Sequence, residues 1–254
     1  MTKSQLSELQ MPTLRFGLRL LVIIVLCTVA VAQARASECV VLLHGLARTS
    51  NSMNDMQEAL NKAGYQVVNL NYPSRDFAVA RLAEIAIPPA LQACAPDVTV
   101  HFVTHSLGGI LVRYYLAQHE LGQLGHVVML APPNQGSEVV DNLADVAGFS
   151  WLNGPAGLEL GTGAEDVPKQ LGQPNFSLGI IAGTQSINLI LSTMLPDPDD
   201  GKVSVQSTKL EGMTDHISLP VTHTFIMQAP DVIAQTLHFL ANGKFNHSEH
   251  ASVR

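Results

Sequence analysis

The residue with the clearest chemical setting is Ser106, in the run THSLGG at residues 104–109. The run follows an apolar segment typical of a buried strand, residues 98–103, and opens a helical segment at 106–119. A serine in such a tight strand-to-helix turn exposes its hydroxyl above the sheet. We therefore predict that Ser106 is a nucleophile; the alternative is an ordinary serine that caps a helix.

The helix that begins at Ser106 bears on the chemistry as well. Its first backbone N–H groups have no partner within the helix, and its N-terminus carries partial positive charge. We expect the N–H of Leu107 to point at the negative oxygen that develops when the serine attacks a carbonyl group. A free serine hydroxyl is a weak nucleophile, so the sequence must also supply a base.

The run around Ser106 resembles the nucleophile turn of the α/β-hydrolases, in their lipase and esterase branch. The usual form of that turn is Gly-x-Ser-x-Gly, and here Thr104 stands in place of the first glycine. A second run, VVLLHGL at residues 40–46, resembles the strand and His-Gly loop of the same family. The resemblance implies that the N–H of Leu46 is a second oxyanion donor beside Leu107. The alternative for His44-Gly45 is a simple β-turn.

In this family the acid follows the serine along the chain and the histidine comes last. Residues 196–203, PDPDDGKV, resemble the Asp-Gly-x-Val stretch that carries the acid in related lipases, which implies Asp200. Asp199 is the alternative. The stretch could also be a solvated acidic turn or a calcium loop, since carboxylate oxygens cluster there. It lacks the full spacing of a helix–loop–helix calcium motif, and we predict no metal.

The resemblance implies His223 as the base, because His223 lies in a short loop before the last predicted helix. His216 is the alternative. We expect the remaining late histidines to be packing or solvated residues: His238, His247 and His250. In the implied triad, His223 takes the proton of Ser106 and returns it to the leaving group, while Asp200 orients the imidazole ring.

The elements that position these residues alternate between strands and helices. We predict strands at residues 39–43, 66–70, 98–103, 126–130 and 178–182, and helices at 51–62, 78–93, 106–119 and 230–240. This alternation predicts an α/β fold with a mostly parallel central sheet and helices on both faces. We expect Pro88 and Pro89 to kink or divide their helix, and residues 202–206 to form a further strand or strand edge.

The alternation lapses at residues 135–175, which are rich in Gly, Pro, Asp and Asn, with weak helical pattern around 139–146. An insertion that follows a strand above the carboxyl edge of the sheet is where lids and caps sit. We therefore expect one α/β-hydrolase domain at residues 37–245 with a small lid-like insertion, followed by a flexible tail at 246–254.

The first 36 residues have the order of a secretory signal. Basic residues precede an apolar run at 20–32, and a small-x-small sequence, Ala34-Arg35-Ala36, follows it. We expect cleavage near Ala36 and a periplasmic or secreted protein; the alternative is an uncleaved N-terminal membrane anchor. Cleavage removes Cys27 and leaves Cys39 and Cys94, which we expect to form a disulfide. The alternative for that pair is two buried free thiols.

Composition limits the partners. The chain has 254 residues, 46% of them hydrophobic, with a formal net charge of -7, so we expect one folded domain and no nucleic acid partner. The resemblance implies hydrolysis of small-molecule or lipid esters without a cofactor, with possible contact to a membrane surface. The alternatives are a thioesterase, amidase or acyltransferase with the same triad, or a non-catalytic binding protein on this scaffold.

Overall fold

The centre of the molecule is a parallel β-sheet. The structure is a computed structural model that describes residues 38–248. Within these residues the sheet has six strands in the order β2-β1-β3-β4-β5-β6, and every neighbouring pair is parallel. The strands are β1 (Glu38–Leu43), β2 (Gln66–Asn69), β3 (Thr99–His105), β4 (Leu124–Leu130), β5 (Leu178–Gly183) and β6 (Asp215–Leu219). The predicted α/β fold with a parallel sheet is confirmed.

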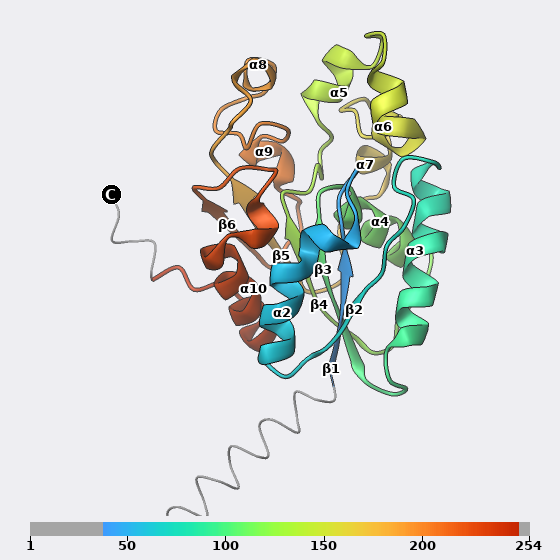
Figure 1. The fold of residues 1–254 in the computed structure, drawn as a ribbon, viewed down its shortest axis with the longest axis vertical. Helices are drawn as coiled ribbons and strands as arrows, with labels where there is room; N and C mark the ends of the chain where they lie inside the picture. Colours follow the sequence, from blue (N-terminus) through green and yellow to red (C-terminus); the bar gives the residue numbers. More distant parts are fainter. Residues whose placement is uncertain (1–37, 249–254) are drawn as a thin grey trace, which may run out of the picture.

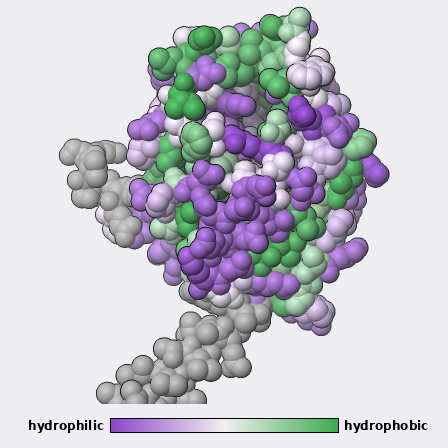
Figure 2. Space-filling view, in the orientation of Figure 1, coloured by the Kyte–Doolittle hydropathy of each residue, from purple (hydrophilic) through white to green (hydrophobic). Residues whose placement is uncertain are grey.

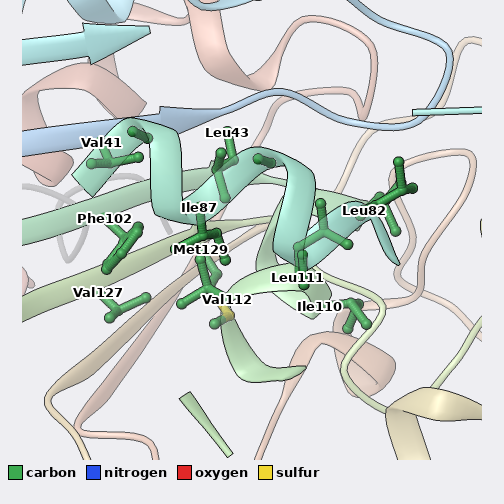
Figure 3. Close-up of a cluster of buried hydrophobic side chains, with 14 of the residues drawn as sticks. Val41, Leu43, Leu82, Ile87, Phe102, Ile110, Leu111, Val112, Val127 and Met129 are labelled. Carbon is green, nitrogen blue, oxygen red and sulfur yellow. The ribbon is translucent and has the colours of Figure 1, made fainter. Parts of the chain in front are cut away.

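Helices cover both faces of this sheet, as Figure 1 shows. The helices α2 (Asn54–Lys62) and α10 (Pro230–Asn242) lie on one face, and α3 (Val79–Ala93) and α4 (Leu107–Leu116) lie on the other. Successive side chains of a strand point to opposite faces, and the core divides accordingly. Val40 and Leu42 pack in the cluster beneath α2 and α10, whereas Val41 and Leu43 pack with α3 and α4 (Figure 3).

The remaining helices lie in two long connections at the carboxyl end of the strands (Figure 1). The connection from β4 to β5 contains α5 (Glu138–Leu143), α6 (Phe149–Leu158) and α7 (Val167–Gln170). The connection from β5 to β6 contains α8 (Leu189–Ser192) and α9 (Val205–Thr208). Two 3₁₀ turns, η1 (Ser50–Met53) and η2 (Ile226–Gln228), precede α2 and α10. The structure thus places the segment predicted as an insertion at one end of the sheet.

Residues 202–206 do not form the strand that the sequence suggests. The Ser204 hydroxyl accepts a hydrogen bond of 3.1 Å from the N–H of Ser207, and this local bond caps the helical turn α9. Such side-chain bonds compete with strand pairing. The sixth strand is instead β6, which the sequence analysis missed. Its apolar residues, Ile217 and Leu219, alternate with polar ones, so its pattern is shorter and weaker than that of the inner strands.

Of the two outcomes predicted for Pro88 and Pro89, a kink or a division of their helix, division does not occur, because α3 is one helix from Val79 to Ala93. Each proline removes one backbone hydrogen bond. The apolar face of α3 is buried against the sheet along its length, from Leu82 to Ala90. In proteins most of the stability of a helix comes from packing of this kind, and here it outweighs the lost bonds.

Both ends of the chain extend beyond the described residues. The predicted signal and its anchor alternative, and the tail from residue 249 with His250, lie outside them. At the end of the described part, Asn246 exchanges two hydrogen bonds of 2.8 Å with the side chain of Gln235. His247 bonds the carboxylate of Asp215 at 2.9 Å. From residue 38 to residue 248, no helix has the length and apolar character needed to cross a membrane.

A disulfide joins Cys39 to Cys94, as the sequence predicts. It connects the start of β1 to the residue that follows α3, across 55 positions of the chain. Both residues are buried in the cluster between the sheet and α3. The bond therefore closes the end of the molecule opposite the long connections.

We predict that thiol titration of the denatured, unreduced protein finds no free thiol at Cys39 or Cys94. The double variant Cys39→Ala/Cys94→Ala should lower the free energy of unfolding by about 2–4 kcal/mol, because its unfolded chain is no longer constrained by the loop. Urea unfolding followed by circular dichroism measures the difference. Two titratable thiols, or unchanged stability in the double variant, would contradict the prediction.

Candidate active site

Ser106 lies at a strained point of the backbone between β3 and α4. Its φ is 52° and its ψ is -118°, a region that non-glycine residues rarely adopt. Such strain persists only where the surroundings fix it. Here the N–H of Ser106 bonds the carbonyl of Leu130 at 2.9 Å, which ties the turn to the end of β4. The hydroxyl of Ser106 faces a pocket at the carboxyl end of the sheet.

Two glycines allow the segments around Ser106 to approach closely. A Cβ on Gly108 would lie 2.6 Å from the carbonyl oxygen of Leu43, so α4 passes directly against the end of β1. A Cβ on Gly45 would lie 2.6 Å from Nδ1 of His105. The His-Gly loop therefore touches the nucleophile turn. Thr104, in the place of the family's first glycine, is fully buried, so the turn accommodates the larger side chain.

The His-Gly loop is held by Tyr72 rather than being a free turn. The ring of His44 stacks on Tyr72 with 4.0 Å between centroids, and the Tyr72 hydroxyl donates a hydrogen bond to the His44 carbonyl. His44 Nε2 accepts from the N–H of Tyr72 at 3.3 Å, and burial lowers the pKa of His44, so the ring is neutral. His44 thus positions the loop that carries Leu46 to the rim of the pocket.

Asp200 and His223 form a buried pair. His223 Nδ1 donates a hydrogen bond of 2.8 Å to Asp200 Oδ2. Asp200 Oδ1 accepts two more, from the N–H groups of Lys202 at 3.0 Å and Val203 at 2.8 Å. The backbones are joined too, because the His223 N–H bonds the Asp200 carbonyl at 3.0 Å. Both carboxylate oxygens are occupied, and the ring of His223 is fixed with Nε2 left for other partners.

His105, the residue before Ser106, supports the loop of His223. Its Nε2 lies 3.0 Å from the His223 carbonyl, and the two rings are 4.8 Å apart. Burial, and secondly the nearby His223, hold the pKa of His105 well below its usual value. A neutral His105 donates this bond through Nε2–H. The sequence analysis did not assign a role to His105, although it lies within the run that identified Ser106.

Ser106 and His223 line one pocket of about 260 Å³. The described residues show no hydrogen bond between the Ser106 hydroxyl and the His223 ring, and such bonds are often long in the absence of substrate. Leu46 lines the same pocket, and Leu107 is the first residue of α4 directly after Ser106. The wall opposite is apolar and comes mainly from the long connections: Pro133, Val139, Val140, Leu143, Phe149, Leu152, Leu160 and Leu191.

The alternative acid and base lie elsewhere. Asp199 Oδ1 accepts hydrogen bonds from the Gly201 N–H at 2.6 Å and the Ser192 hydroxyl at 2.8 Å, so it holds the loop together. Asp199 and Asp200 are both buried, so these two carboxylates do not belong to a solvated acidic turn. His216 lies on β6 beside Thr208, where burial lowers its pKa to about 4. Neither alternative lines the pocket of Ser106.

A buried arginine connects α4 to the connection above it. Arg113 donates hydrogen bonds to the carbonyls of Asn134 at 3.0 Å, Pro168 at 3.2 Å and Gly172 at 3.0 Å. Burial lowers its pKa to about 10, so the guanidinium remains charged at neutral pH. The helix that begins after Ser106 is thereby bonded to both ends of the segment that covers the pocket. Across residues 38–248, no cluster of three or more His, Cys, Asp or Glu could hold a metal ion.

Comparison with solved structures finds the same fold at low identity. The mature lipase BlEst2 of Bacillus licheniformis matches with a TM-score of 0.61 and 21% identity, over 79% of this chain and 91% of that one. The metagenomic carboxyl esterase MGS0156 matches with a TM-score of 0.59 and 20% identity, over 74% of this chain and 65% of that one. The phospholipase PlaB of Legionella pneumophila matches with a TM-score of 0.56 and 22% identity, over 68% of this chain and 45% of that one. No curated protein matches in sequence.

A sequence profile gives the family directly. The profile described as "Alpha/beta hydrolase family" matches residues 40–235, which is most of the chain. The match runs from β1 into α10 and includes Ser106, Asp200 and His223. The sheet, the turn at Ser106 and this match together show that the chain belongs to the alpha/beta hydrolase family.

Proposed function

We propose that this protein is a serine hydrolase that cleaves carboxylic esters through an acyl-enzyme intermediate, with Ser106, Asp200 and His223 as its triad. One observation carries the proposal: a serine held in a strained turn opens into an apolar pocket that also contains a histidine bonded to a buried carboxylate. Nucleophile, base and orienting acid are the parts that acyl transfer requires.

In the proposed mechanism, His223 Nε2 accepts the proton of Ser106 as Oγ attacks the ester carbonyl carbon. The carbonyl oxygen becomes an oxyanion, which the N–H groups of Leu46 and Leu107 stabilise; loss of one such donor typically costs about 3 kcal/mol. When the tetrahedral intermediate collapses, the bond to the alcohol breaks and His223 returns the proton to the leaving alkoxide. Water then attacks the acyl-enzyme by the same route and releases the carboxylic acid.

Asp200 would act through His223. Its Oδ2 fixes the ring with Nδ1–H toward the carboxylate, which leaves Nε2 as the base. The two backbone N–H groups at Oδ1 hold the carboxylate in place. A fixed negative charge at this position stabilises the imidazolium that forms during the reaction.

The substrate of this site would have an apolar acyl group, because the wall of the pocket facing Ser106 is aliphatic and aromatic. The similar structures named above are a lipase, a carboxyl esterase and a phospholipase, and all three are ester hydrolases. A thioester or an amide could enter the same chemistry. Turnover of a thioester or amide with the same acyl group, compared with the oxygen ester, separates these alternatives.

We also propose that the protein is exported. The disulfide between Cys39 and Cys94 supports this, because disulfides persist in oxidising compartments and are rare in the cytosol. It agrees with the proposed secretory signal at residues 1–36, which lie outside the described structure.

Apolar side chains around the pocket mouth support contact with a lipid surface. On α8 and just before it, Ile187, Leu189 and Ile190 are each at least 66% exposed, and on α6 Trp151 is 80% exposed. Figure 2 shows apolar surface on both sides of a hollow at this end of the molecule. Neighbouring residues of the same two helices line the pocket. Lipid is the occupant that would cover such a rim and also present an ester to the pocket.

We predict that Ser106→Ala abolishes turnover of a short p-nitrophenyl ester and covalent labelling by a fluorophosphonate, because both need the serine oxygen. Circular dichroism should show a folded protein. Ser52→Ala, which removes a hydroxyl in η1 outside the pocket, should leave both activities unchanged. Normal labelling of the Ser106 variant would refute the assignment.

The acid and the base can be tested against their alternatives. We predict that His223→Ala lowers kcat nearly as much as Ser106→Ala, and that Asp200→Asn lowers it by about a thousandfold or more, because triad members act as a unit. His216→Ala and Asp199→Asn should have mild effects. The measurement is kcat on one short-chain ester. An inactive His216 variant beside an active His223 variant would move the base, and a severe Asp199 effect beside a mild Asp200 effect would move the acid.

For the lipid contact, we predict that Trp151→Ser/Ile190→Ser weakens binding to phosphatidylcholine vesicles by roughly tenfold, because less apolar surface enters the lipid. Co-sedimentation with vesicles measures the partition. Leu70→Ser, which changes an exposed leucine that belongs to neither helix, is the control. Equal binding by the double variant and the wild type would exclude this rim as the contact surface.

A further inference from the structure

The polar part of the pocket carries charge of one sign. Two of its lining residues are basic, Arg48 and Lys202, and the described residues that line it include no aspartate or glutamate. This sign is opposite to that of the whole chain, whose formal net charge is -7. The positive charge is therefore a local property of the pocket, and it differs from the charge of the protein as a whole.

Both basic residues lie on the loops that carry the proposed catalytic groups. Arg48 is two residues after Leu46, and its guanidinium donates a hydrogen bond of 3.3 Å to the carbonyl of Thr224, next to His223. Lys202 is two residues after Asp200. Its N–H bonds the Asp200 carboxylate at 3.0 Å and its carbonyl accepts from the Ser137 hydroxyl at 2.7 Å. The backbone of Lys202 is therefore fixed, and the side chain of Arg48 is bonded to the loop of His223.

Within residues 38–248, neither charge forms an ion pair with a carboxylate. Among the described residues, no carboxylate oxygen lies within 4.0 Å of the Arg48 guanidinium or the Lys202 ammonium. Asp200 acts on Lys202 electrostatically, yet its two oxygens are already bonded to His223 and to backbone N–H groups. Arg48 also borders a second hollow with Arg75 and Asp76, and no ion pair joins Arg48 to Asp76.

The two basic side chains also act on each other. Lys202 lines the pocket, where it is partly buried and keeps solvent-exposed surface. Its pKa is lowered first by these surroundings and then by the charge of Arg48, whereas Asp200 raises it. Two unpaired cations that repel each other at the rim of a pocket form a site that an anion would stabilise.

We propose that Arg48 and Lys202 bind an anionic group, a phosphate or a carboxylate, on the alcohol part of the ester substrate. The anion is assigned to the alcohol because a charge on the acyl chain would have to lie against the apolar wall. The inference rests on the proposed function. It narrows the proposed substrates from esters in general to esters whose alcohol part carries a phosphate or a carboxylate. The same groups orient such a substrate, since two cations on opposite loops hold one anion between them.

The test compares two soluble esters that differ only in the phosphate: hexanoyl-glycerol and hexanoyl-glycerol 3-phosphate. Hexanoyl-glycerate forms a third arm that separates a carboxylate from a phosphate. We expect the wild type to show a kcat/KM at least about tenfold higher for one of the anionic esters, equivalent to about 1.4 kcal/mol. This preference should fall as salt is added, because salt screens exposed charges.

Variants assign the preference to the two cations. Arg48→Gln and Lys202→Gln should each reduce the ratio of kcat/KM between anionic and neutral ester severalfold, and the double variant should bring it near one. Arg81→Gln and Lys62→Gln remove the same charges from exposed positions of α3 and α2, away from the pocket, and should keep the wild-type ratio. The salt dependence of the wild type tests the proposal even if a variant does not fold.

Three results would overturn the inference: a wild-type ratio near one, an unchanged ratio in the double variant, or an equal loss in the control variants, which would show an effect of net charge alone. A further result would also overturn it: a wild-type ratio near one, together with inhibition by free hexanoate that disappears in the double variant. The two cations would then bind the carboxylate of the acid product and not the alcohol part of the substrate. If neither ester is cleaved and Ser106 is not labelled, the proposed function itself fails. If the neutral ester is cleaved without an anionic preference, only this inference fails.

Discussion

The site depends on one constraint, the reversal of the chain at Ser106 between β3 and α4. The backbone there has a positive φ, and it is tolerated because the turn is fixed on several sides. The Ser106 N–H bonds the end of β4, and the absence of a side chain at Gly108 lets α4 rest against the end of β1. The same closeness brings the His-Gly loop, through Gly45, against His105. The groups that could act on a substrate are thus assembled by backbone contacts between neighbouring strands.

A second set of contacts fixes the late residues of the site relative to this turn. His223 is bonded to Asp200 through both its ring and its backbone, and His105 bonds the His223 carbonyl from the nucleophile turn. The acid loop and the histidine loop are therefore one unit, attached to the residue beside Ser106. In a site of this kind, little reorganisation is needed when charge develops on the imidazole and on the substrate oxygen.

Much of this arrangement could be predicted from the sequence, because the signals are local. Continuous aliphatic runs indicate buried parallel strands, and the turn at Ser106 and the Asp-Gly stretch resemble short runs of the alpha/beta hydrolase family. The structure brings Ser106, Asp200 and His223 to one end of the sheet, as expected. β6 was missed because an edge strand of five residues with alternating polar positions has a weak pattern. The strand predicted at residues 202–206 does not form, because the side chain of Ser204 caps a helical turn there.

Other features have no local signal. Arg48 and Lys202 lie far apart in the chain, and only the fold shows that they share a pocket without a carboxylate. The continuity of α3 through Pro88 and Pro89 likewise depends on the sheet beneath it, which propensity does not include. Tertiary packing decides such cases, so they are visible only once the strands have been placed.

The position of Arg113 has a consequence for how a substrate reaches Ser106. One guanidinium bonds Asn134 at the start of the covering segment and Pro168 and Gly172 near its end. Both ends of the segment are therefore bonded to the helix that begins after Ser106. A movement of the whole segment away from α4, like a flap on a single hinge, would have to break these bonds at one end or the other. Under the proposed function, access of a substrate to Ser106 would therefore depend on displacement within the segment, between its two bonded ends.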